Sequence, residues 1–256
     1  MIHPTAIVGS DVELAPDVEV GPYSVLEGPL QVGAGTKIGP HVVIRGPTRI
    51  GRDNRIFQFA SLGDDPQDKK YAGEPTELVI GDGNTIREYV TINRGTVQDA
   101  GVTRIGDDNW IMAYVHIAHD CQVGDHTIFA NNASLAGHVH VGDHAILGGF
   151  TLVHQFCSIG AHAFTAFGST IARDVPPYVM VGGHPAQPHG LNTEGLRRRG
   201  FSEETIRQLK LAYRTLYRDG LSLEEAIERL RIQAETIPEV REMVTFLERR
   251  RRGLLR

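Results

Sequence analysis

The chain has 256 residues, 41% of them apolar, so it is long enough to bury a substantial core. Its 29 glycines are many for an ordinary globular chain, but they show no collagen period. Two cysteines do not suggest a disulfide framework. The start lacks a signal peptide's basic and apolar regions, and no apolar stretch is long enough for a membrane span. We therefore expect a cytoplasmic protein without stable membrane insertion.

The formal charge of -5 is unevenly distributed along the chain. The part up to Gly190 carries a balance of -9, and the remainder, from Leu191 onward, carries +4. Such asymmetry predicts that the basic tail meets an acidic partner, although solvated helix faces explain it equally simply. Nucleic-acid binding is not expected, because wider basic character and aromatic platforms are missing.

A six-residue repeat dominates the first part of the chain. An aliphatic or similar residue returns at every sixth position from Ile105 to Ile171, with Thr165 as the only polar member. The next residue is frequently Gly or Ala, and the fifth place holds mostly small or β-branched residues. The same period runs earlier from Ile2 to Leu62 and resumes at Ile80–Ile92. Self-similarity at a fixed period indicates a repeat architecture.

A period of six fits neither an α-helix nor a free-standing strand, but it fits a short strand plus a turn. Three such units close a coil of 18 residues, and stacked coils pair their strands in parallel about 4.8 Å apart. Residues 1–190 are therefore predicted to form a parallel β-helix, with loops inserted near 63–78 and 98–104. A sandwich with accidental periodicity is the alternative. The general rule for parallel crossovers favours a right-handed coil.

The pattern turns helical in the tail, residues 191–256, which we predict to be a small α-helical domain. Its start and stop signals are Ser202 at a helix start, Asp219-Gly220 at its end, a capping box of Ser222 with Glu225, and Pro238 in the first turn of the last helix. These amphipathic helices should cover the open end of the coil and pack against neighbouring subunits. The run Arg249–Arg252 is most simply a solvated helix end.

The 18-residue coil converts sequence spacing into geometry. Three successive coils carry His119, His138 and His154 on one face, with neighbours expected roughly 5 to 10 Å apart. His116 lies near the same corner. These histidines occupy different places in their units, so the repeat itself does not explain them. A functional cluster is favoured.

A second column of three histidines recurs at intervals of 18 residues. His126, His144 and His162 each take the fourth place of their unit. That place is the exposed corner of the coil, so solvated turn histidines are the simpler interpretation of this column.

Three kinds of chemistry compete for the first column. Converging histidines can bind zinc, as in the β-helical carbonic anhydrases, but the spacing match is loose. A nucleophilic pair of Cys121 with His119 is rejected, because Cys121 and Cys157 hold the small inward place and act as core hydrophobes. The favoured interpretation is general-base catalysis, in which His119 takes a proton from a substrate hydroxyl that attacks a thioester carbonyl. Asp120 follows and can orient the imidazole.

Seven segments in order make the resemblance specific. QDKKYAGEPT, TINRGTV, HIAHDCQVG, NNASLAGHV, VHQFCSIGAH, DVPPY and EGLRRRGFS resemble the UDP-N-acetylglucosamine 3-O-acyltransferases, hexapeptide-repeat acyltransferases of lipid A biosynthesis. The resemblance implies a left-handed parallel β-helix followed by a small α-helical C-terminal domain, and a homotrimer with its cleft between subunits. It also implies transfer of a 3-hydroxyacyl group to the glucosamine 3-hydroxyl. The donor is the phosphopantetheine of acyl carrier protein, and no metal or other cofactor takes part.

The resemblance carries roles over to matching residues. His119 matches the family's catalytic base, Asp120 its partner, and Gly137 the backbone N–H that stabilises the thioester oxyanion. The substrate-binding set, to which we add His116 from its place near that corner, is Asp68, Lys70, His116, His138, His154, Gln155, Asn192, Glu194, Arg198 and Arg199.

Phe167 falls at the place that limits acyl length in the family. It lies almost three coils beyond His119, about 13 Å along the stack. A bulky ring there should block a long channel, so we expect a preference for a shorter acyl chain of about ten carbons, by analogy with family members that carry a bulky residue. The alternative is a ring buried within the stack.

The basic tail then has a candidate partner, since acyl carrier proteins are acidic. Two alternative functions stay open. One is acylation of another sugar nucleotide, such as a 3-amino analogue. The other is a β-helix that transfers no acyl group, either a zinc hydratase or a scaffold.

Overall fold

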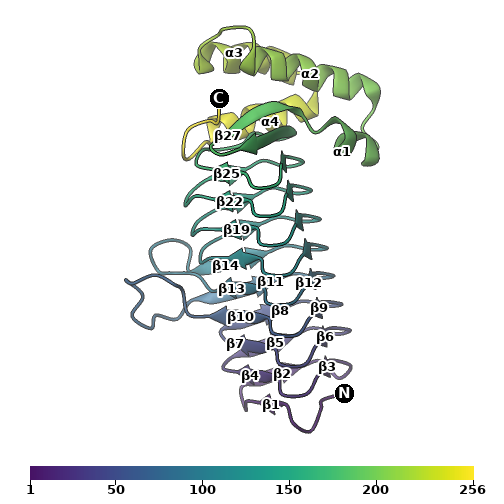
Figure 1. The fold of residues 1–256 in the computed structure, drawn as a ribbon, viewed down its shortest axis with the longest axis vertical. Helices are drawn as coiled ribbons and strands as arrows, with labels where there is room; N and C mark the ends of the chain where they lie inside the picture. Colours follow the sequence, from purple (N-terminus) through teal and green to yellow (C-terminus); the bar gives the residue numbers. More distant parts are fainter.

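The computed structural model describes all 256 residues, Met1–Arg256, and places the greater part of them in a stack of three-sided coils (Figure 1). The first face is a parallel sheet of β1 (Ile7–Val8), β4 (Val25–Glu27), β7 (Val43–Arg45), β10 (Ser61–Asp64), β13 (Thr91–Asn93), β16 (His116–Ile117), β19 (Ser134–Leu135), β22 (Leu152–Val153) and β25 (Thr170–Ile171). The second face is a parallel sheet of β2 (Val12–Leu14), β5 (Leu30–Val32), β8 (Thr48–Ile50), β11 (Glu77–Ile80), β14 (Val102–Ile105), β17 (Gln122–Val123), β20 (His140–Val141) and β23 (Ser158–Ile159). The third face holds β3 (Glu19–Val20), β6 (Lys37–Ile38), β9 (Arg55–Ile56), β12 (Thr85–Ile86), β15 (Trp110–Ile111), β18 (Ile128–Phe129), β21 (Ile146–Leu147), β24 (Phe164–Thr165), β26 (Val179–Gly183) and β27 (Ala186–Leu191).

The register of the sheets follows the predicted 18-residue coil. Ile117 pairs with Leu135, and Leu135 pairs with Val153, so the repeated aliphatic residues stack in one interior row. These side chains are almost completely buried and belong to a core cluster of 40 residues. The predicted fold class, a left-handed parallel β-helix with a small helical end, is confirmed.

The corners of the coil form three columns of residues with positive φ. We name them after one member each: the Asp120 corner (Asp120, His138 and Phe156), the His126 corner (Asp108, His126, His144 and His162) and the Tyr114 corner (Tyr23, His41, Phe59, Tyr89 and Tyr114). Left-handed backbone is tolerated best by Gly, Asn, Asp and His. At the Tyr114 corner the five rings stack in sequence, with neighbouring centroids 4.8 to 5.3 Å apart.

The single polar member of the repeat is buried without loss of hydrogen bonding. The Thr165 hydroxyl lies 2.7 Å from the hydroxyl of Thr151 and accepts a bond of 3.1 Å from the N–H of Gly148. A buried hydroxyl with partners avoids the desolvation cost of an unpaired one, so the coil continues through this position.

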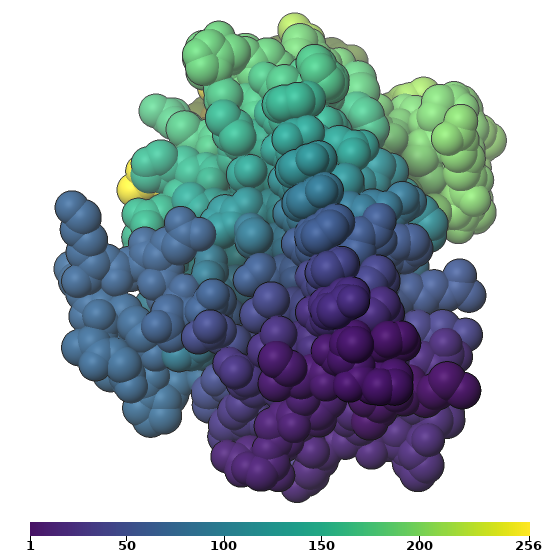
Figure 2. Space-filling model, turned by 60° about the horizontal axis from the view of Figure 1, so that its bottom comes forward, coloured from purple at the N-terminus to yellow at the C-terminus, as the bar shows by residue number.

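Two loops interrupt the coil and project from the same side of it (Figures 1 and 2). The first runs from Asp65 to Thr76, and the second from Arg94 to Gly101, which begins earlier than the interruption expected at 98–104. Arg94 joins them: its guanidinium donates to the carbonyl of Gly63 at 2.8 Å, to the hydroxyl of Tyr71 at 2.7 Å, and to the carboxylate of Asp65.

Helices cover the C-terminal end of the stack (Figure 1). They are α1 (Thr193–Arg198), α2 (Glu203–Tyr217), α3 (Leu223–Ala234) and α4 (Pro238–Glu248). The start signals were correct: Ser202 caps α2, Ser222 and Glu225 form the capping box of α3, and Pro238 is the first residue of α4. The helices have their own cluster of 15 buried residues. None is long and apolar enough to cross a membrane.

Two parts of this end were not anticipated. Nothing in the sequence pattern indicated the antiparallel pair β26 and β27, or the short helix α1. The run Arg249–Arg252 follows α4, and three of its four residues are exposed, as expected of a solvated end. The backbone N–H groups of Arg251 and Arg252 nevertheless donate to the Asp174 carboxylate at 2.6 and 3.0 Å, so the tail folds back onto the coil.

Candidate active site

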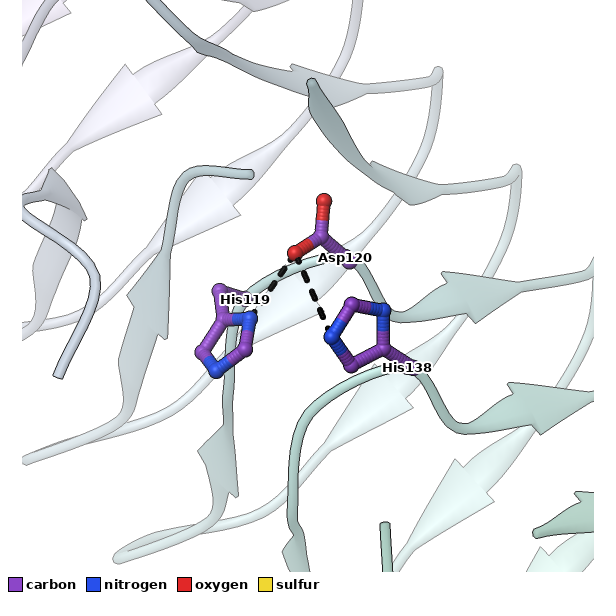
Figure 3. A group of neighbouring side chains, drawn as sticks. All are labelled: His119, Asp120 and His138. Carbon is purple, nitrogen blue, oxygen red and sulfur yellow. Dashed lines mark hydrogen bonds and ion pairs between the residues drawn. The ribbon is translucent and has the colours of Figure 1, made fainter. Parts of the chain in front are cut away.

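Three side chains meet at the Asp120 corner (Figure 3). His119 follows β16, Asp120 turns the corner, and His138 stands at the same corner one coil later. The Nδ1 atom of His119 lies 2.8 Å from Oδ2 of Asp120, and the Nε2 atom of His138 lies 3.8 Å from the same oxygen. The two imidazole rings stand edge to face, with centroids 5.1 Å apart.

The second loop fixes the carboxylate of Asp120. Thr96 donates its N–H to Oδ1 at 2.9 Å and its hydroxyl to Oδ2 at 2.6 Å, and the N–H of Asp120 donates to the hydroxyl of Thr103 at 2.8 Å. Burial alone would raise the pKa of Asp120, but hydrogen bonds from His119 and Thr96 hold this pKa below its usual value. Asp120 is therefore ionised at neutral pH.

An ionised carboxylate only accepts hydrogen bonds, so the proton of the His119 ring lies on Nδ1. The opposite nitrogen, Nε2, keeps its lone pair, which is the arrangement that a general base requires. His119 is only 5% exposed, and Asp120 is 1% exposed, so their bond is protected from water. The arrangement can accept a proton from a bound hydroxyl and hold the resulting imidazolium beside a carboxylate.

Gly137 lies directly against the His119 ring. A Cβ atom added at Gly137 would stand 2.5 Å from Cε1 and 2.7 Å from Nε2 of His119. The N–H of Gly137 donates to no acceptor within the chain. Glycine is therefore required here for close approach, and its N–H is available to an oxygen outside the protein.

His116 is a further histidine close enough to His119 for the two rings to interact electrostatically. Its Nδ1 lies 2.7 Å from the hydroxyl of Thr91, and burial, followed by the proximity of His119, lowers the pKa of His116. A lowered pKa favours the neutral ring at physiological pH. His116 therefore borders the pair without adding a fixed charge to it.

His154 and Gln155 do not join this cluster within one chain. Both are exposed, and the only close polar partner of the His154 ring is the carbonyl of Gln155, at 3.1 Å. The third coil instead contributes Phe156, whose ring stacks on His138 at a centroid distance of 4.4 Å. Phe156 follows His138 by one full coil of sequence, so the coil spacing could have identified it.

Asp68 and Lys70 lie in the first loop, away from His119. The Lys70 N–H donates to the Asp68 carboxylate at 3.0 Å, and the Lys70 side chain is exposed. Neither side chain contacts the His119 pair within the chain, so this loop offers a separate polar surface.

The four predicted residues near the tail lie at the His126 corner, across the coil from His119. Asn192 caps α1 and donates to the carbonyl of His162 at 3.1 Å. Glu194 forms an ion pair with Arg197, Arg198 is exposed, and Arg199 is half-buried, with a pKa lowered by burial. One chain thus contains two groups of candidate residues at two different corners.

The second histidine column is not simply solvated. His126 is exposed, but His144 and His162 are half-buried. The three rings stack with centroids 4.8 and 4.7 Å apart, and His162 then stacks on Tyr178 at 5.5 Å. Burial, followed by His144 and Arg199, lowers the pKa of His162 to about 4.

The two cysteines are free and buried. Burial raises the pKa of each thiol to about 12. A buried thiol with a raised pKa is a poor nucleophile, which agrees with the rejection of a Cys121 nucleophile.

Phe167 is 76% exposed, which excludes the alternative of a ring buried within the stack. Its ring lies edge to face with Phe150, at a centroid distance of 5.6 Å. The ring therefore stands on the surface, where it can meet a ligand or another subunit.

The ligand atoms of His119, Asp120 and His138 lie within 4.8 Å of one another, close enough to hold a metal ion together. However, Oδ2 of Asp120 already accepts hydrogen bonds from His119 and Thr96. Metal coordination would have to replace these bonds.

Comparison with known proteins identifies the family to which this chain is related. A family model for the second domain of UDP-N-acetylglucosamine O-acyltransferase matches residues 174–255, and a model of six bacterial transferase hexapeptides matches residues 103–137. The acyl-[acyl-carrier-protein]–UDP-N-acetylglucosamine O-acyltransferase of Thiobacillus denitrificans is 62% identical, over 100% of this chain and 99% of the relative. Its counterpart in Halorhodospira halophila is 63% identical, with the same coverage.

A solved structure agrees with the sequence relatives. The UDP-N-acetylglucosamine O-acyltransferase of Moraxella catarrhalis is 49% identical, covers 100% of this chain and 99% of its own, and superposes with a TM-score of 0.98. The β-helix and the match to bacterial transferase hexapeptides place the chain in the class of hexapeptide-repeat transferases. Within this class, the chain belongs to the UDP-N-acetylglucosamine O-acyltransferase family and is an acyltransferase.

Proposed function

We propose that the chain transfers a 3-hydroxyacyl group from acyl carrier protein to the 3-hydroxyl of UDP-N-acetylglucosamine, the first step of lipid A biosynthesis. The observation that carries this proposal is the buried pair of His119 and Asp120, in which Nδ1 of the ring lies 2.8 Å from the carboxylate and Nε2 is left free of it. The reaction is tested by incubating the protein with UDP-N-acetylglucosamine and hydroxyacyl carriers of graded length. Formation of an O-acylated sugar nucleotide supports the proposal, and its absence with every carrier contradicts it.

The mechanism uses His119 twice. Nε2 removes the proton of the sugar hydroxyl as the oxygen attacks the thioester carbonyl, which gives a tetrahedral intermediate. The intermediate collapses to the ester, the carbon–sulfur bond breaks, and the departing thiolate takes the proton from the imidazolium. Asp120 orients the ring and balances its charge, while the N–H of Gly137 donates to the oxyanion, a contribution of about 10² to 10³ in rate at such sites.

We also propose a homotrimer with sites between subunits. The two groups of candidate residues lie at different corners of one coil, which supports assembly of each site from two chains. The exposed rings of Tyr23, Phe59, Tyr89 and Tyr114 at the Tyr114 corner provide an apolar edge for subunit contact. Co-refolded mixtures of His119→Ala and Arg199→Ala subunits should regain activity that neither variant has alone, and light scattering should give the mass of three chains. A monomeric mass, or no regain in mixed oligomers, counts against shared sites.

The tail offers a docking surface for the acidic carrier. Arg251 donates to the carbonyl of His138 at 3.2 Å, which brings this basic segment to the Asp120 corner. Complementary charge mainly accelerates encounter, and salt screens it. Activity at low carrier concentration should therefore fall as ionic strength rises, and an activity insensitive to salt would exclude electrostatic docking.

Phe167 is proposed to set the acyl length, with a preference for about ten carbons by family analogy. Phe167→Gly removes a surface ring, so we expect longer acyl chains to gain about tenfold relative to the ten-carbon chain, within the range for a few methylenes. Competition between carriers of different length measures this ratio. Trp110→Gly, which removes an exposed ring from the third face, is the control. An unchanged preference in Phe167→Gly contradicts the proposed role.

One alternative acceptor keeps specific support. A base and an oxyanion donor serve an amine as well as a hydroxyl, so a 3-amino sugar nucleotide is a competing acceptor. Competition between the two acceptors decides between them. The zinc hydratase is set aside, because the chain belongs to an acyltransferase family. The cytoplasmic location stays a prediction.

A further inference from the structure

The second loop reaches the site at a second point besides Asp120. Asp99, near the end of this loop, places Oδ2 2.8 Å from Nδ1 of His138. The His138 side chain is 8% exposed, while that of Asp99 is 39% exposed. Ion pairs between two exposed side chains contribute little to stability. A short hydrogen bond from a buried imidazole to a carboxylate is stronger and fixes the ring.

The aromatic contacts of His138 fix the plane of its ring but not its direction, and the 3.8 Å from Nε2 to Oδ2 of Asp120 is too long for a hydrogen bond that would set it. Phe156 stacks on one face at 4.4 Å, with an interplanar angle of 13°. His119 approaches edge to face, at 89°. Neither contact distinguishes Nδ1 from Nε2, so a flipped ring would keep both. The short bond to Asp99 does distinguish them, because a carboxylate accepts only from the nitrogen that carries a proton.

We propose that Asp99 is a positioning residue that holds His138 with a protonated Nδ1 outward and Nε2 directed toward the His119 pair. This inference rests on the proposed contact of His138 with the substrate. The loop then acts on both parts of the site: Thr96 holds the carboxylate of Asp120, and Asp99, three residues later, holds His138. Loss of Asp99 leaves Nδ1 facing solvent and frees the ring to exchange its two orientations and tautomers.

The test compares Asp99→Ala, Asp99→Glu and a matched control, Gln98→Ala. Gln98 is the exposed neighbour in the loop and makes no hydrogen bond to the site. We expect kcat/KM for UDP-N-acetylglucosamine to fall about tenfold in Asp99→Ala, within the range for a hydrogen bond to a charged group. Asp99→Glu should restore most of this loss, Gln98→Ala should match the parent, and all three proteins should keep the parent oligomer mass. An Asp99→Ala enzyme with parental kcat/KM overturns the proposal.

A spectroscopic measurement separates positioning from general damage. In protein carrying ¹⁵N-labelled histidine, His138 should show one protonated Nδ1 in the parent and averaged nitrogen shifts in Asp99→Ala. Unchanged His138 shifts overturn the proposal whatever the kinetics.

A double-mutant cycle separates this inference from the assignment of the site itself. If His138→Asn has parental activity, the proposed role of His138 is wrong. If His138→Asn is impaired and Asp99→Ala is not, only the inference on Asp99 fails. Adding Asp99→Ala to His138→Asn should cost nothing further, and an additive loss would show that Asp99 acts elsewhere.

Discussion

Histidines stand at both the Asp120 corner and the His126 corner of the coil, but their rings make different contacts at the two corners. At the Asp120 corner, ring nitrogens face carboxylate oxygens, at 2.8 Å for His119 and 2.8 Å for His138. At the His126 corner the rings stack face to face, and the nearest carboxylate contact, from Asp108 to His126, is 3.8 Å. The same residue type, repeated from coil to coil, is thus bonded to carboxylates in one column and stacked on other rings in the other, and we propose proton transfer only for the first.

The difference lies in what surrounds each column. The second loop covers the Asp120 corner and supplies Thr96 and Asp99, whereas the His126 corner lies against Tyr178 and the helical end. Where carboxylates face the nitrogens, each ring has a hydrogen-bond partner at 2.8 Å. Where rings face rings and Arg199 is near, burial lowers the pKa of His144 and His162, so the neutral forms persist.

The sharpest test of this comparison removes one histidine from each corner. His119→Ala should lower kcat by about 10³-fold, as expected for the loss of a general base, while the oligomer stays folded. His126→Asn keeps a residue that tolerates left-handed backbone and should retain parental activity. Steady-state rates and oligomer mass check both variants. Substantial turnover in His119→Ala would refute the assignment of the base.

The carboxylates can be compared in the same way. Asp120→Asn should lower kcat by about 10² to 10³-fold, because an amide can present a donor to Nδ1 and stabilise the wrong tautomer of His119. Asp108→Asn, beside His126, is the matched control and should change kcat by less than about twofold. Equal losses of kcat in the two variants would show that the carboxylate at the Asp120 corner has no special role in the reaction.

Gly137→Ala tests the close packing at the Asp120 corner. The new methyl would displace the His119 ring, and a shift of about 1 Å at a reacting atom costs about 10²-fold in rate. Gly9→Ala, whose Cβ would meet no atom closer than 3.3 Å, is the control. The pH at which kcat/KM is half-maximal should move in Gly137→Ala, because the bond between His119 and Asp120 is disturbed.

The smallest effect is expected at the His126 corner and concerns stability. The folded-state pKa of His162, about 4, lies below its ordinary value of 6.5. The unfolded chain therefore binds the proton first, and the free energy of unfolding falls as the pH drops from 6.5 toward 4. His162→Phe removes this titrating group. The free energy of unfolding should therefore fall by about 1 kcal/mol less between pH 7 and pH 5 than in the parent, a value discounted for the partial exposure of His162. Denaturant unfolding at the two pH values measures it. An identical pH dependence in parent and variant would contradict the assignment.

The fold could be predicted from sequence because every coil repeats the same physical requirement. One aliphatic residue fills the interior and one residue turns each corner, so the rule is expressed many times. The helix starts could also be predicted, because Ser202, Ser222 and Pro238 stabilise the first turns of the helices that begin there. Handedness was available only through resemblance, and α1 was not predicted because a helix of six residues is too short to show a helical period. The division into domains at residue 190 stays a prediction, with the two separate cores as its physical basis.

The site was less predictable, because part of it comes from outside the repeat. The spacing brought His119 and His138 together, but it gave no sign of Thr96 or Asp99, which lie in a loop without periodicity. The same spacing placed His154 in the cluster, whereas the third coil contributes Phe156 at that corner. Regular spacing identifies residues on one face. It does not indicate which side chains turn toward each other across a corner.

The left-handed backbone at Asp120 has a consequence for how such a chain changes over generations. With φ at +59°, the position disfavours most side chains but accepts Asn or Gly with little strain. The substitutions that the backbone accepts most easily are therefore ones that abolish ionisation at this point and leave the coil intact. A lineage can lose its chemistry here and still inherit a well-formed protein, so an intact hexapeptide pattern in a relative does not establish an active enzyme. Whether a relative keeps a carboxylate at this corner is the more direct indication of activity.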